Sequence, residues 1–352
     1  MHRMGILTSG GDCQGLNTAI RGICKALYHE FDADSLELVG FLDGYTGLIK
    51  NEYKILTSLD FSEIIDIGGT ILGTSRQPFK RLRIIGEDNI DKVEAMKKSY
   101  NKAELECLFV LGGNGTQKTA NLLSGEGLNI ISLPKTIDND IWGTDMTFGF
   151  QSAIDAATEY IDHIYTTAKS HGRIFVVEIM GHKAGWLALH SGVAGGADII
   201  LIPEIPCTLG SIYKNIEKNK KEGKNFSIIA LAEGAVFSFG SEAVPRGKEG
   251  GSPSYRLARE LSKLTVQEVK VAVPGYYQRG GSTSAYDRIL ATKFGAAAAD
   301  LAKKKIYGKM VSLKDGEIVP IDLSEVAGKI KSVPTDYNLI KYAKSIGICF
   351  GD

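Results

Sequence analysis

The sequence predicts an α/β fold with mainly parallel sheets, and three features of the chain support this. Short apolar runs alternate with amphipathic stretches, which is the pattern of strands connected by helices. The apolar runs are nearly continuous in Val, Ile and Leu, as expected of strands that are covered on both faces. Glycine clusters follow several of these runs at the point where a strand would end. Because ligands bind beyond the carboxyl ends of strands in such sheets, these clusters are candidate binding loops.

The pattern of apolar and polar residues predicts where the helices and strands lie. Residues 214–224 carry many lysines, and we interpret them as a solvated helix face and loop. No repeat and no low-complexity linker divides the chain. The amphipathic stretches predict helices at residues 17–28, 152–167 and 254–264. The apolar runs predict strands at residues 4–7, 36–41, 107–111, 129–133, 173–179, 198–202, 226–232 and 269–273.

Length and composition limit the classes of protein to which the chain can belong. It has 352 residues, and domains typically hold about 100–200, so we expect two domains or one large bilobal unit. Apolar residues make up 43 % of the chain, which is enough for a sizeable core. Lys plus Arg and Asp plus Glu each number 41, so the basic surplus of a nucleic-acid-binding protein is missing. We therefore expect no nucleic-acid partner, although a few cations could still form a pocket for a small anion.

The cysteines and the apolar runs indicate the compartment. The five cysteines are widely spaced and include no Cys-x-x-Cys pair, which argues against a disulfide framework or a zinc site and fits a reducing cytosol. The N-terminus passes directly into a strand-like run, so we expect no signal peptide. No run reaches the roughly 18 apolar residues of a membrane span. We predict a cytoplasmic protein with no membrane partner.

Two glycine loops have the pattern of phosphate sites. In both Leu7-Thr8-Ser9-Gly10-Gly11-Asp12 and Leu111-Gly112-Gly113-Asn114-Gly115-Thr116, a predicted strand leads into a glycine turn and then into a helix. Backbone N–H groups and the helix dipole favour an anion there. The first loop is neither a Walker A nor a Gly-x-Gly-x-x-Gly motif. One such loop alone could be an ordinary tight turn, but two loops could hold a polyphosphate between them.

The segment Pro134-Lys135-Thr136-Ile137-Asp138-Asn139-Asp140 brings two carboxylates, a hydroxyl and an amine to the end of another predicted strand. A carboxylate near a bound polyphosphate can accept the proton of an attacking hydroxyl, which makes Asp138 the candidate base. The alternative is an Asx-rich turn that only hydrogen-bonds its own backbone.

Three arginines occur in further glycine-bearing loops: Arg76, Arg173 and Arg279. A guanidinium group suits phosphate because its planar fork can bond two oxygens at once. Each alone is an ordinary surface arginine, but together they favour a sugar-phosphate site.

These segments resemble the phosphofructokinase family, in which they occur in the same order, and the resemblance covers nearly the whole chain. It implies a phosphofructokinase-like domain over about residues 3–305, with two interleaved, doubly wound lobes. Residues 1–138 plus about 252–306 would form the larger, donor-binding lobe, and residues 139–251 plus about 307–352 the smaller, sugar-phosphate-binding lobe. The matching motifs are Leu-Thr-Ser-Gly-Gly-Asp, Gly-Gly-Thr-Ile-Leu-Gly-Thr-Ser-Arg, Pro-Lys-Thr-Ile-Asp-Asn-Asp, Val-Glu-Ile-Met-Gly and Gln-Arg-Gly-Gly-Ser.

The family transfers a phosphoryl group to the 1-hydroxyl of fructose 6-phosphate in glycolysis, and the resemblance implies a role for each matching residue. Asp138 would accept the proton of the sugar hydroxyl, Arg76 would face the transferring phosphoryl group, and Thr136 would hold the reactive end of the sugar. The donor would contact Gly11, Arg76, Gln77, Gly113, Asn114, Gly115 and Thr116. The sugar phosphate would contact Thr136, Ile137, Asp138, Arg173, Met180, Gly181, His182, Glu233, Lys270, Tyr276 and Arg279.

The resemblance also implies assembly and regulation. Arg279 would bind the 6-phosphate within one subunit, whereas Arg173 would reach the site of a neighbouring subunit, so an oligomer is implied, a tetramer built from dimers. Arg21 and Lys25 match basic positions of the effector site in bacterial members.

The chain departs from the family pattern at four positions. Asn114 replaces an Asp that helps to anchor Mg²⁺, so the metal would be held mostly by donor phosphates or by another carboxylate such as Asp12 or Asp140. His182 replaces an Arg, so an imidazole stands where the family has a permanent cation. Lys270 stands where many bacterial members have Arg, and Tyr276 where they have His.

Two residues give opposite indications of the donor. Gly115 leaves room for the adenylate of ATP, where pyrophosphate-dependent members have an obstructing Asp. Lys135 matches the pyrophosphate-dependent members, but the combination also occurs in an ATP-using branch. Steric exclusion is the stronger argument, so we expect ATP, with pyrophosphate as the alternative.

Two other interpretations remain. A kinase of the NAD-kinase or lipid-kinase type would share the glycine loop but leaves the Thr-Ile-Asp-Asn-Asp and Gln-Arg-Gly-Gly segments unexplained. A non-catalytic homologue that binds sugar phosphate and nucleotide is suggested by Asn114 and His182. The presence of Asp138, Thr136, Arg76, Arg173 and Arg279 argues against it.

Overall fold

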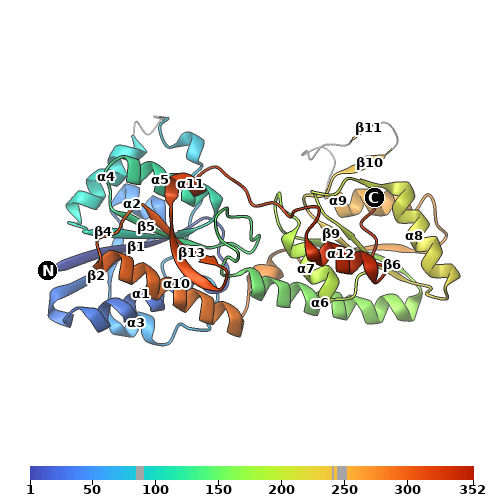
Figure 1. Cartoon of the computed structure of the whole chain (residues 1–352), viewed down its shortest axis with the longest axis horizontal. Helices are drawn as coiled ribbons and strands as arrows, with labels where there is room; N and C mark the ends of the chain where they lie inside the picture. The colour runs from blue at the N-terminus through green and yellow to red at the C-terminus, as the bar shows by residue number, and fades with distance from the viewer. Residues whose placement is uncertain (85–90, 240–241, 244–251) are drawn as a thin grey trace. The chain divides into compact units, whose positions relative to one another are not determined.

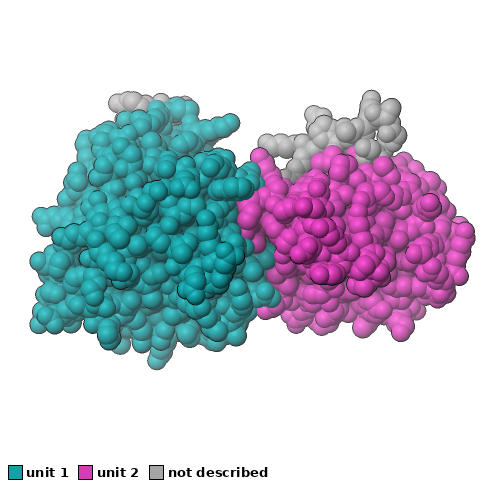
Figure 2. Space-filling view, viewed as in Figure 1, with its two compact units in different colours: residues 1–137, 141–152, 279–330 teal, residues 138–140, 153–278, 331–352 magenta. Residues whose placement is uncertain are grey.

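The computed structural model describes residues 1–84, 91–239, 242–243 and 252–352. The chain forms two compact units, which Figure 2 shows in different colours. Unit 1 comprises residues 1–137, 141–152 and 279–330, and unit 2 comprises residues 138–140, 153–278 and 331–352. Within the described part of the chain, no helix is both long and apolar enough to cross a membrane.

Unit 1 contains a seven-stranded sheet in the order β14-β13-β5-β4-β1-β2-β3 (Figure 1). Its five inner strands are parallel, whereas β3 and β14 pair antiparallel at the two edges. The strands are β1 (His2–Ser9), β2 (Leu36–Phe41), β3 (Tyr53–Leu56), β4 (Cys107–Gly112), β5 (Ile130–Pro134), β13 (Lys309–Lys314) and β14 (Glu317–Asp322).

Helices cover both faces of this sheet and enclose two apolar clusters. On one face α1 packs against α10 at a close crossing, where a methyl group on Gly22 would lie 3.3 Å from the Cα of Gly295. The helices of unit 1 are α1 (Leu16–Glu30), α2 (Tyr45–Lys50), α3 (Ser58–Ser62), α4 (Lys92–Lys102), α5 (Asn114–Gly125), α10 (Ala285–Lys303) and α11 (Leu323–Val326), with 3-10 turns η1 (Ala33–Ser35) and η2 (Phe79–Arg81). The first residues of α6 (Phe150–His171) also belong to unit 1.

Unit 2 contains a parallel four-stranded sheet in the order β12-β6-β9-β7, and a small sheet in the order β11-β10-β8. The strands are β6 (Ile174–Ile179), β7 (Ile199–Leu201), β8 (Cys207–Thr208), β9 (Ser227–Ala232), β10 (Phe237–Phe239), β11 (Glu242–Ala243) and β12 (Val269–Ala272). Its helices are the rest of α6, α7 (Trp186–Ala194), α8 (Leu209–Lys221), α9 (Pro253–Leu261) and α12 (Asn338–Ser345), with the 3-10 turn η3 (Gly275–Arg279).

The predicted fold class is confirmed, and every predicted strand and helix is present with small shifts at its ends. The lysine-rich stretch forms the end of α8, as interpreted from the sequence. The division into units differs from the expected lobes in three regions, because residues 141–152 and 307–330 lie in unit 1 and residues 252–278 lie in unit 2. β12 pairs with β6 and so belongs to unit 2, whereas β13 pairs with β5 and so belongs to unit 1. The expected boundary at 251 lies outside the described residues.

A hairpin formed by β13 and β14 was not predicted. Lys314 pairs with Glu317, so Asp315 and Gly316 form a two-residue turn. Both turn residues have positive φ, 50° and 86°, as a type I′ turn requires. The Asp-Gly pair between alternating strand residues was therefore a usable signal in the sequence.

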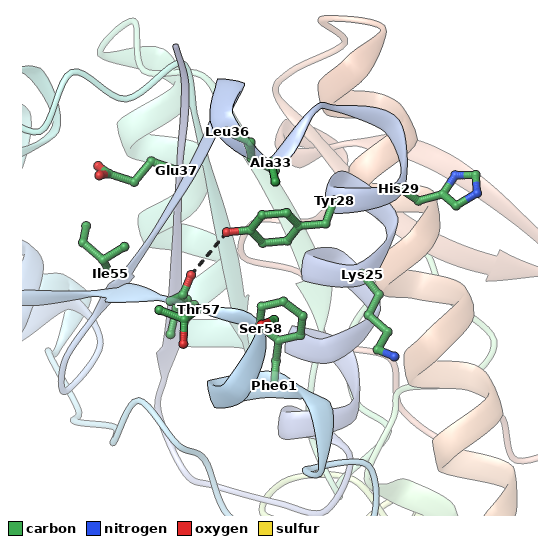
Figure 3. Close-up of a pocket in the computed structure, with 11 residues that line it drawn as sticks. Lys25, Tyr28, His29, Ala33, Leu36, Glu37, Ile55, Thr57, Ser58 and Phe61 are labelled. Carbon is green, nitrogen blue, oxygen red and sulfur yellow. Dashed lines mark hydrogen bonds between the residues drawn. The ribbon is translucent and has the colours of Figure 1, made fainter.

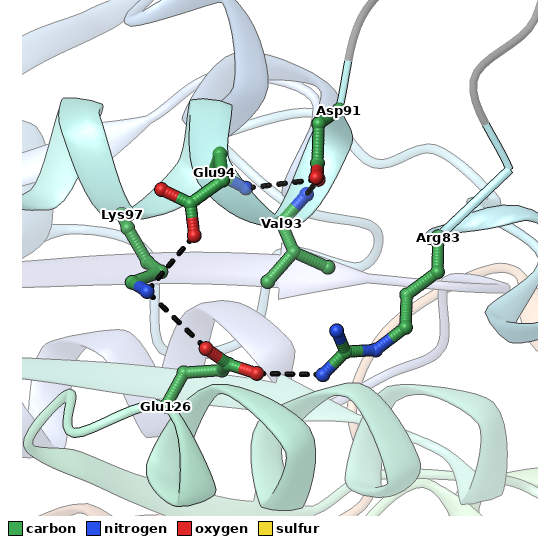
Figure 4. A network of polar contacts seen from close by, with 6 residues as sticks. All are labelled: Arg83, Asp91, Val93, Glu94, Lys97 and Glu126. Carbon is green, nitrogen blue, oxygen red and sulfur yellow. Dashed lines mark hydrogen bonds and ion pairs between the residues drawn. The ribbon is translucent and has the colours of Figure 1, made fainter.

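A charged network joins the start of α4 to the end of α5 (Figure 4). Glu126, which follows α5, accepts hydrogen bonds from Arg83 Nη2 at 2.6 Å and from Lys97 Nζ at 3.2 Å. Asp91 caps α4 by accepting from the backbone N–H groups of Val93 and Glu94. These bonds join Arg83 and Lys97 to Glu126 and satisfy the first N–H groups of α4.

Candidate functional site

Three parallel strands of unit 1 end in register at one edge of the sheet. Ser9 at the end of β1 pairs with Gly112 at the end of β4, and Gly112 pairs with Pro134 at the end of β5. The three loops singled out from the sequence therefore emerge side by side, as expected for ligand-binding loops of a parallel sheet.

The first loop turns sharply at Gly10, whose φ of 90° is in the left-handed region that favours glycine. The Gly10 N–H donates to Ser75 O at 3.0 Å, and Thr74 Oγ1 donates to Gly10 O at 2.7 Å. This pairing attaches the segment that carries Arg76 to the glycine loop.

Two guanidinium groups reach Gly11. A methyl group on Gly11 would overlap Arg279 Nη1 and would lie 3.5 Å from Arg76 Nη2. Arg279 also lies 3.9 Å from the carboxylate of Asp12. The family resemblance implies a sugar-phosphate role for Arg279, which lies in unit 1 beside the first loop.

A third cation approaches the same glycine. The Lys135 side chain is only 3 % exposed, and its ammonium group donates to the Gly11 carbonyl. Lys135, Arg76 and Arg279 come from three separate segments, so the fold concentrates positive charge around Gly11. This charge suits a polyanion, because Arg and Lys form short charge-assisted bonds with phosphate oxygens.

The second loop begins α5. Gly113 is its N-cap and provides no side-chain cap, and the first turn has no acidic residue, so the N–H groups and the dipole favour an anion. Thr116 Oγ1 donates to Ser9 O at 3.3 Å, and Tyr45 OH donates to Thr116 O at 3.1 Å. The hydroxyl of Thr116 thus ties the second loop to the first. Gln77 Nε2 donates to Thr46 Oγ1 at 2.9 Å, in the segment beside Arg76.

A buried glutamine that the sequence analysis missed holds the loop ends together. Gln117 Nε2 donates to Gly112 O at 2.9 Å and to Leu133 O at 3.2 Å, and Ser132 Oγ donates to its Oε1 at 2.6 Å. A polar residue one turn after a glycine loop was the only signal in the sequence.

The face of α5 that carries Gly115 borders an open cavity. Apart from its chain neighbours and the backbone of its own helix, no atom of the described residues lies within 4 Å of a methyl group placed on Gly115. Lys118 and Leu122 follow Gly115 on the same helical face, and both line a cavity of about 930 Å³. The full lining is Pro78, Phe79, Lys80, Arg81, Lys118, Asn121, Leu122, Ala327 and Gly328.

The third loop continues from Lys135 to Asp140. Thr136 is buried, and its backbone N–H and O bond to Phe148 O at 3.3 Å and Thr147 Oγ1 at 2.8 Å. Ile137 is also buried. Asp138 is half-buried, and Asn139 after it has a left-handed φ of 50°.

Unit 2 gathers several of the predicted sugar-phosphate residues around Gly181. The His182 N–H donates to Glu233 Oε1 at 2.6 Å, and the Met180 N–H donates to Gln278 Oε1 at 3.2 Å. Gln278 Nε2 donates in turn to Gly275 O at 3.1 Å, next to Tyr276. Gln278 is fully buried and links the Met180 loop to the Tyr276 loop, a role that its motif did not indicate.

Arg173 and Lys270 lie on either side of one carboxylate. Arg173 Nε is 2.5 Å from Glu268 Oε2, and Lys270 forms an ion pair with the other carboxylate oxygen. Lys270 and then Arg173 lower the pKa of Glu268 below its ordinary value. The two predicted phosphate-binding cations therefore share a partner in unit 2.

The two residues matched to an effector site lie along α1. Lys25 lines a cavity of about 630 Å³, shown in Figure 3, together with Tyr28, His29, Glu37 and Thr57. Arg21 is not part of this lining and donates to Ser62 O at 3.5 Å.

The side chains around the glycine loops do not form a metal cage of their own. Over the described ranges, no group of three or more His, Cys, Asp or Glu side chains could hold a metal ion. Asn114 offers a neutral oxygen, and Asp12 offers a partly exposed carboxylate beside the first loop. The residues present therefore fit a divalent ion that is bound mainly through the phosphates of a ligand.

The sequence has close relatives with known names. It is 53 % identical over 363 residues to the ATP-dependent 6-phosphofructokinase of Spirochaeta thermophila, a match that covers 99 % of this chain and 97 % of the relative. It is 44 % identical to ATP-dependent 6-phosphofructokinase 3 of Bacteroides thetaiotaomicron, covering 99 % of this chain and all of the relative.

Solved structures share the fold. The phosphofructokinase of Pichia pastoris in the T-state superposes with a TM-score of 0.81 and 31 % identity over 92 % of this chain, which spans only 35 % of that longer protein. The pyrophosphate-dependent phosphofructokinase of Marinobacter aquaeolei, 22 % identical, has a TM-score of 0.81 over 99 % of this chain and 88 % of its own. A family model described as Phosphofructokinase matches residues 3–302. The chain therefore belongs to the phosphofructokinase family.

Proposed function

We propose that this protein is an ATP-dependent 6-phosphofructokinase, which converts fructose 6-phosphate and ATP into fructose 1,6-bisphosphate and ADP in glycolysis. The observation that carries the proposal is the convergence of Arg76, Arg279 and Lys135 on Gly11, at the ends of three strands that finish in register. The names of the relatives that match this chain over its full length support the same activity.

In the proposed reaction Asp138 is the general base. Its carboxylate accepts the proton of the 1-hydroxyl, and the hydroxyl oxygen forms a bond to the γ-phosphorus of ATP. The bond between the γ-phosphorus and the bridging oxygen breaks, and ADP leaves with the electron pair. Arg76 and the N–H groups of the two glycine loops stabilise the negative charge on the phosphoryl oxygens. Thr136, Met180, Glu233 and Tyr276 orient the sugar.

The space beside Gly115 supports ATP as the donor. An adenosine group needs a cavity next to the phosphate loops, and the cavity of about 930 Å³ shares the α5 face with Gly115. The ammonium group of Lys135 favours the alternative donor, pyrophosphate, because it adds a cation where the diphosphate would lie. Lys135 is nevertheless compatible with ATP, since it bonds the backbone of Gly11 and leaves the α5 face open.

Kinases of this family generally need a divalent metal, and we propose Mg²⁺ on the donor phosphates with Asp12 as the nearest carboxylate of the first loop. When bound, the ion neutralises charge on the phosphate oxygens. We also propose a cytoplasmic homotetramer in which Arg173 serves a neighbouring subunit, with effector binding near Arg21 and Lys25.

A coupled assay of the purified protein with fructose 6-phosphate, Mg²⁺ and either ATP or pyrophosphate tests the activity and the donor together. Asp138→Asn should lower turnover about 10²- to 10⁴-fold, because the amide cannot accept the proton, while fructose 6-phosphate still binds. Asp336→Asn changes an exposed carboxylate of the same unit and should behave as wild type. Turnover at the wild-type rate in Asp138→Asn would show that Asp138 is not the general base.

A further inference from the structure

The segment from Lys331 to Val333, which we call the C-terminal clamp, lies against the loop that carries Asp138. The Lys331 N–H donates to Asp140 O at 2.9 Å. The Lys331 ammonium group donates to Asn139 Oδ1, also at 2.9 Å. Backbone and side chain of one residue therefore hold the two residues that directly follow Asp138.

The clamp is itself anchored on α7. Trp186 Nε1 donates to Lys331 O at 2.8 Å, and the Lys331 ammonium lies 5.4 Å from the centre of the Trp186 ring. Glu204 accepts the Val333 N–H at 3.0 Å and also the N–H of Gly185, which precedes Trp186. Lys331 is consequently held through its N–H, its carbonyl and its ammonium group.

Asn139 is the residue through which this anchoring reaches Asp138. Its φ of 50° is left-handed, a conformation that costs free energy in most residues other than glycine but that asparagine adopts more readily than most. The side chain of Asn139 is 3 % exposed and accepts the Lys331 bond. A rotation at residue 139 would shift the preceding carboxylate, and a displacement of about 1 Å at a reacting group can cost about 10²-fold in rate.

We propose that Lys331 is a positioning residue, which holds Asn139 in its left-handed conformation and so orients the Asp138 carboxylate for proton transfer. The proposal rests on the function proposed above. Lys331 does not contact the reactants in this role, and its effect reaches them only through the loop.

The kinetic test compares two lysines of the same region of the chain. Lys331→Met keeps the side-chain stem and removes the ammonium group, and it should lower kcat about 10- to 100-fold while the KM for ATP stays within about twofold. Lys331→Arg keeps a cation and should recover part of the loss. Lys329→Met is the control, because Lys329 is exposed and lies over Trp142 instead.

A double-mutant cycle of Lys331 and Asn139 distinguishes a positioning role of Lys331 from a general loss of folding. Asn139→Ala removes the acceptor, so adding Lys331→Met to it should lower kcat little further, whereas independent roles would multiply the two losses. Unfolding temperatures of all variants show which of them remain folded. Multiplicative losses, or wild-type kcat in Lys331→Met, would overturn the proposal.

Amide hydrogen exchange tests the role of Lys331 independently of the proposed enzymatic activity. The amides of residues 136–141 should exchange faster in Lys331→Met and at the wild-type rate in Lys329→Met. Unchanged exchange in Lys331→Met would overturn the clamp whatever the activity. If the wild type turned over neither donor, the proposed function would fail, and the exchange rates would still decide whether Lys331 orders the loop.

Discussion

Gly11 and Arg279 lie so close together that a side chain on residue 11 would occupy the position of the Arg279 Nη1 atom. Arg76 approaches the same point from another loop, and the Lys135 ammonium bonds the carbonyl of Gly11. A side chain on residue 11 would therefore push the Arg279 guanidinium group aside, although the backbone conformation of Gly11 itself is open to other residues.

Gly11→Ala should therefore displace Arg279 from its place beside the first loop and, with it, Arg76 from the donor phosphates. We expect kcat/KM for ATP to fall about 10²-fold, comparable to the loss of one charge-stabilising donor. Gly115→Ala is the matched control, because the described residues leave its side open and its φ is not left-handed. The measurement is steady-state kinetics of both variants. Equal losses of kcat/KM in Gly11→Ala and Gly115→Ala would contradict the role proposed for the first loop.

Gly115→Asp should change the donor and leave the fold intact. An aspartate would project into the space beside the α5 cavity and would obstruct an adenylate there, but pyrophosphate would not reach it. We expect the ratio of ATP-dependent to pyrophosphate-dependent activity to fall at least about tenfold. Parallel losses with both donors would show that Gly115 does not select between them.

Asn114→Asp should lower the Mg²⁺ concentration that gives half the maximal rate. The carboxylate adds a charged ligand at the start of α5, where the described residues supply no complete metal cage. The measurement is a Mg²⁺ titration at fixed total ATP. An unchanged requirement would indicate that the phosphates and Asp12 already saturate the ion.

Gln278→Leu should raise the KM for fructose 6-phosphate by about tenfold and leave the KM for ATP unchanged, because the variant breaks the link between Met180 and Gly275. Gln267→Leu is a control in the same unit, since Gln267 also donates to two backbone carbonyls, those of Gly172 and Asn225. A similar rise in KM in both variants would point to general destabilisation.

Asp60→Asn should make the protein less stable at neutral pH only. The Thr57 N–H first and Lys54 next lower the pKa of Asp60 from 3.8 to about 2. Because the folded-state pKa lies below the unfolded one, this stabilisation is complete above about pH 4 and disappears as the pH falls toward 2. We expect Tm to fall by about 2 °C at pH 6, because the variant loses a capping interaction of about 1 kcal/mol. The ion pair with Lys54 adds little, because it lies at an exposed position. The difference should vanish near pH 2, and a constant difference would contradict the assignment.

The sequence predicted the parts of the molecule that depend on local pattern. Buried strands such as Leu36–Phe41 appear as apolar runs, and the glycine loops follow them directly. Strand neighbours are not local. β13 lies beside β5, although the paired residues Lys309 and Ile131 are 178 positions apart (309 − 131), and this pairing extends unit 1 to a late part of the chain.

The same limit applies to the site. Asp138 and Arg76 stand in recognisable motifs, and their roles remain predictions. Lys331 has no motif, and its contact with Asn139 joins residues 192 positions apart in the chain. Gln117 and Gln278 are likewise buried amides whose hydrogen-bond partners depend on the folded structure, so the sequence indicated at most the position of Gln117 after a glycine loop and not its partners.

The placement of β13 and β14 has a consequence for synthesis on the ribosome. Both strands complete the sheet of unit 1 beside β5, yet they are translated after residues 153–278 of unit 2. Until they emerge, the edge of β5 has no neighbour on that side, and an unpaired strand edge invites pairing with other chains. The nascent protein thus cannot finish its first unit before most of its second unit has been made, and the risk of aggregation during translation is concentrated on one strand that, in the finished molecule, lies inside the sheet.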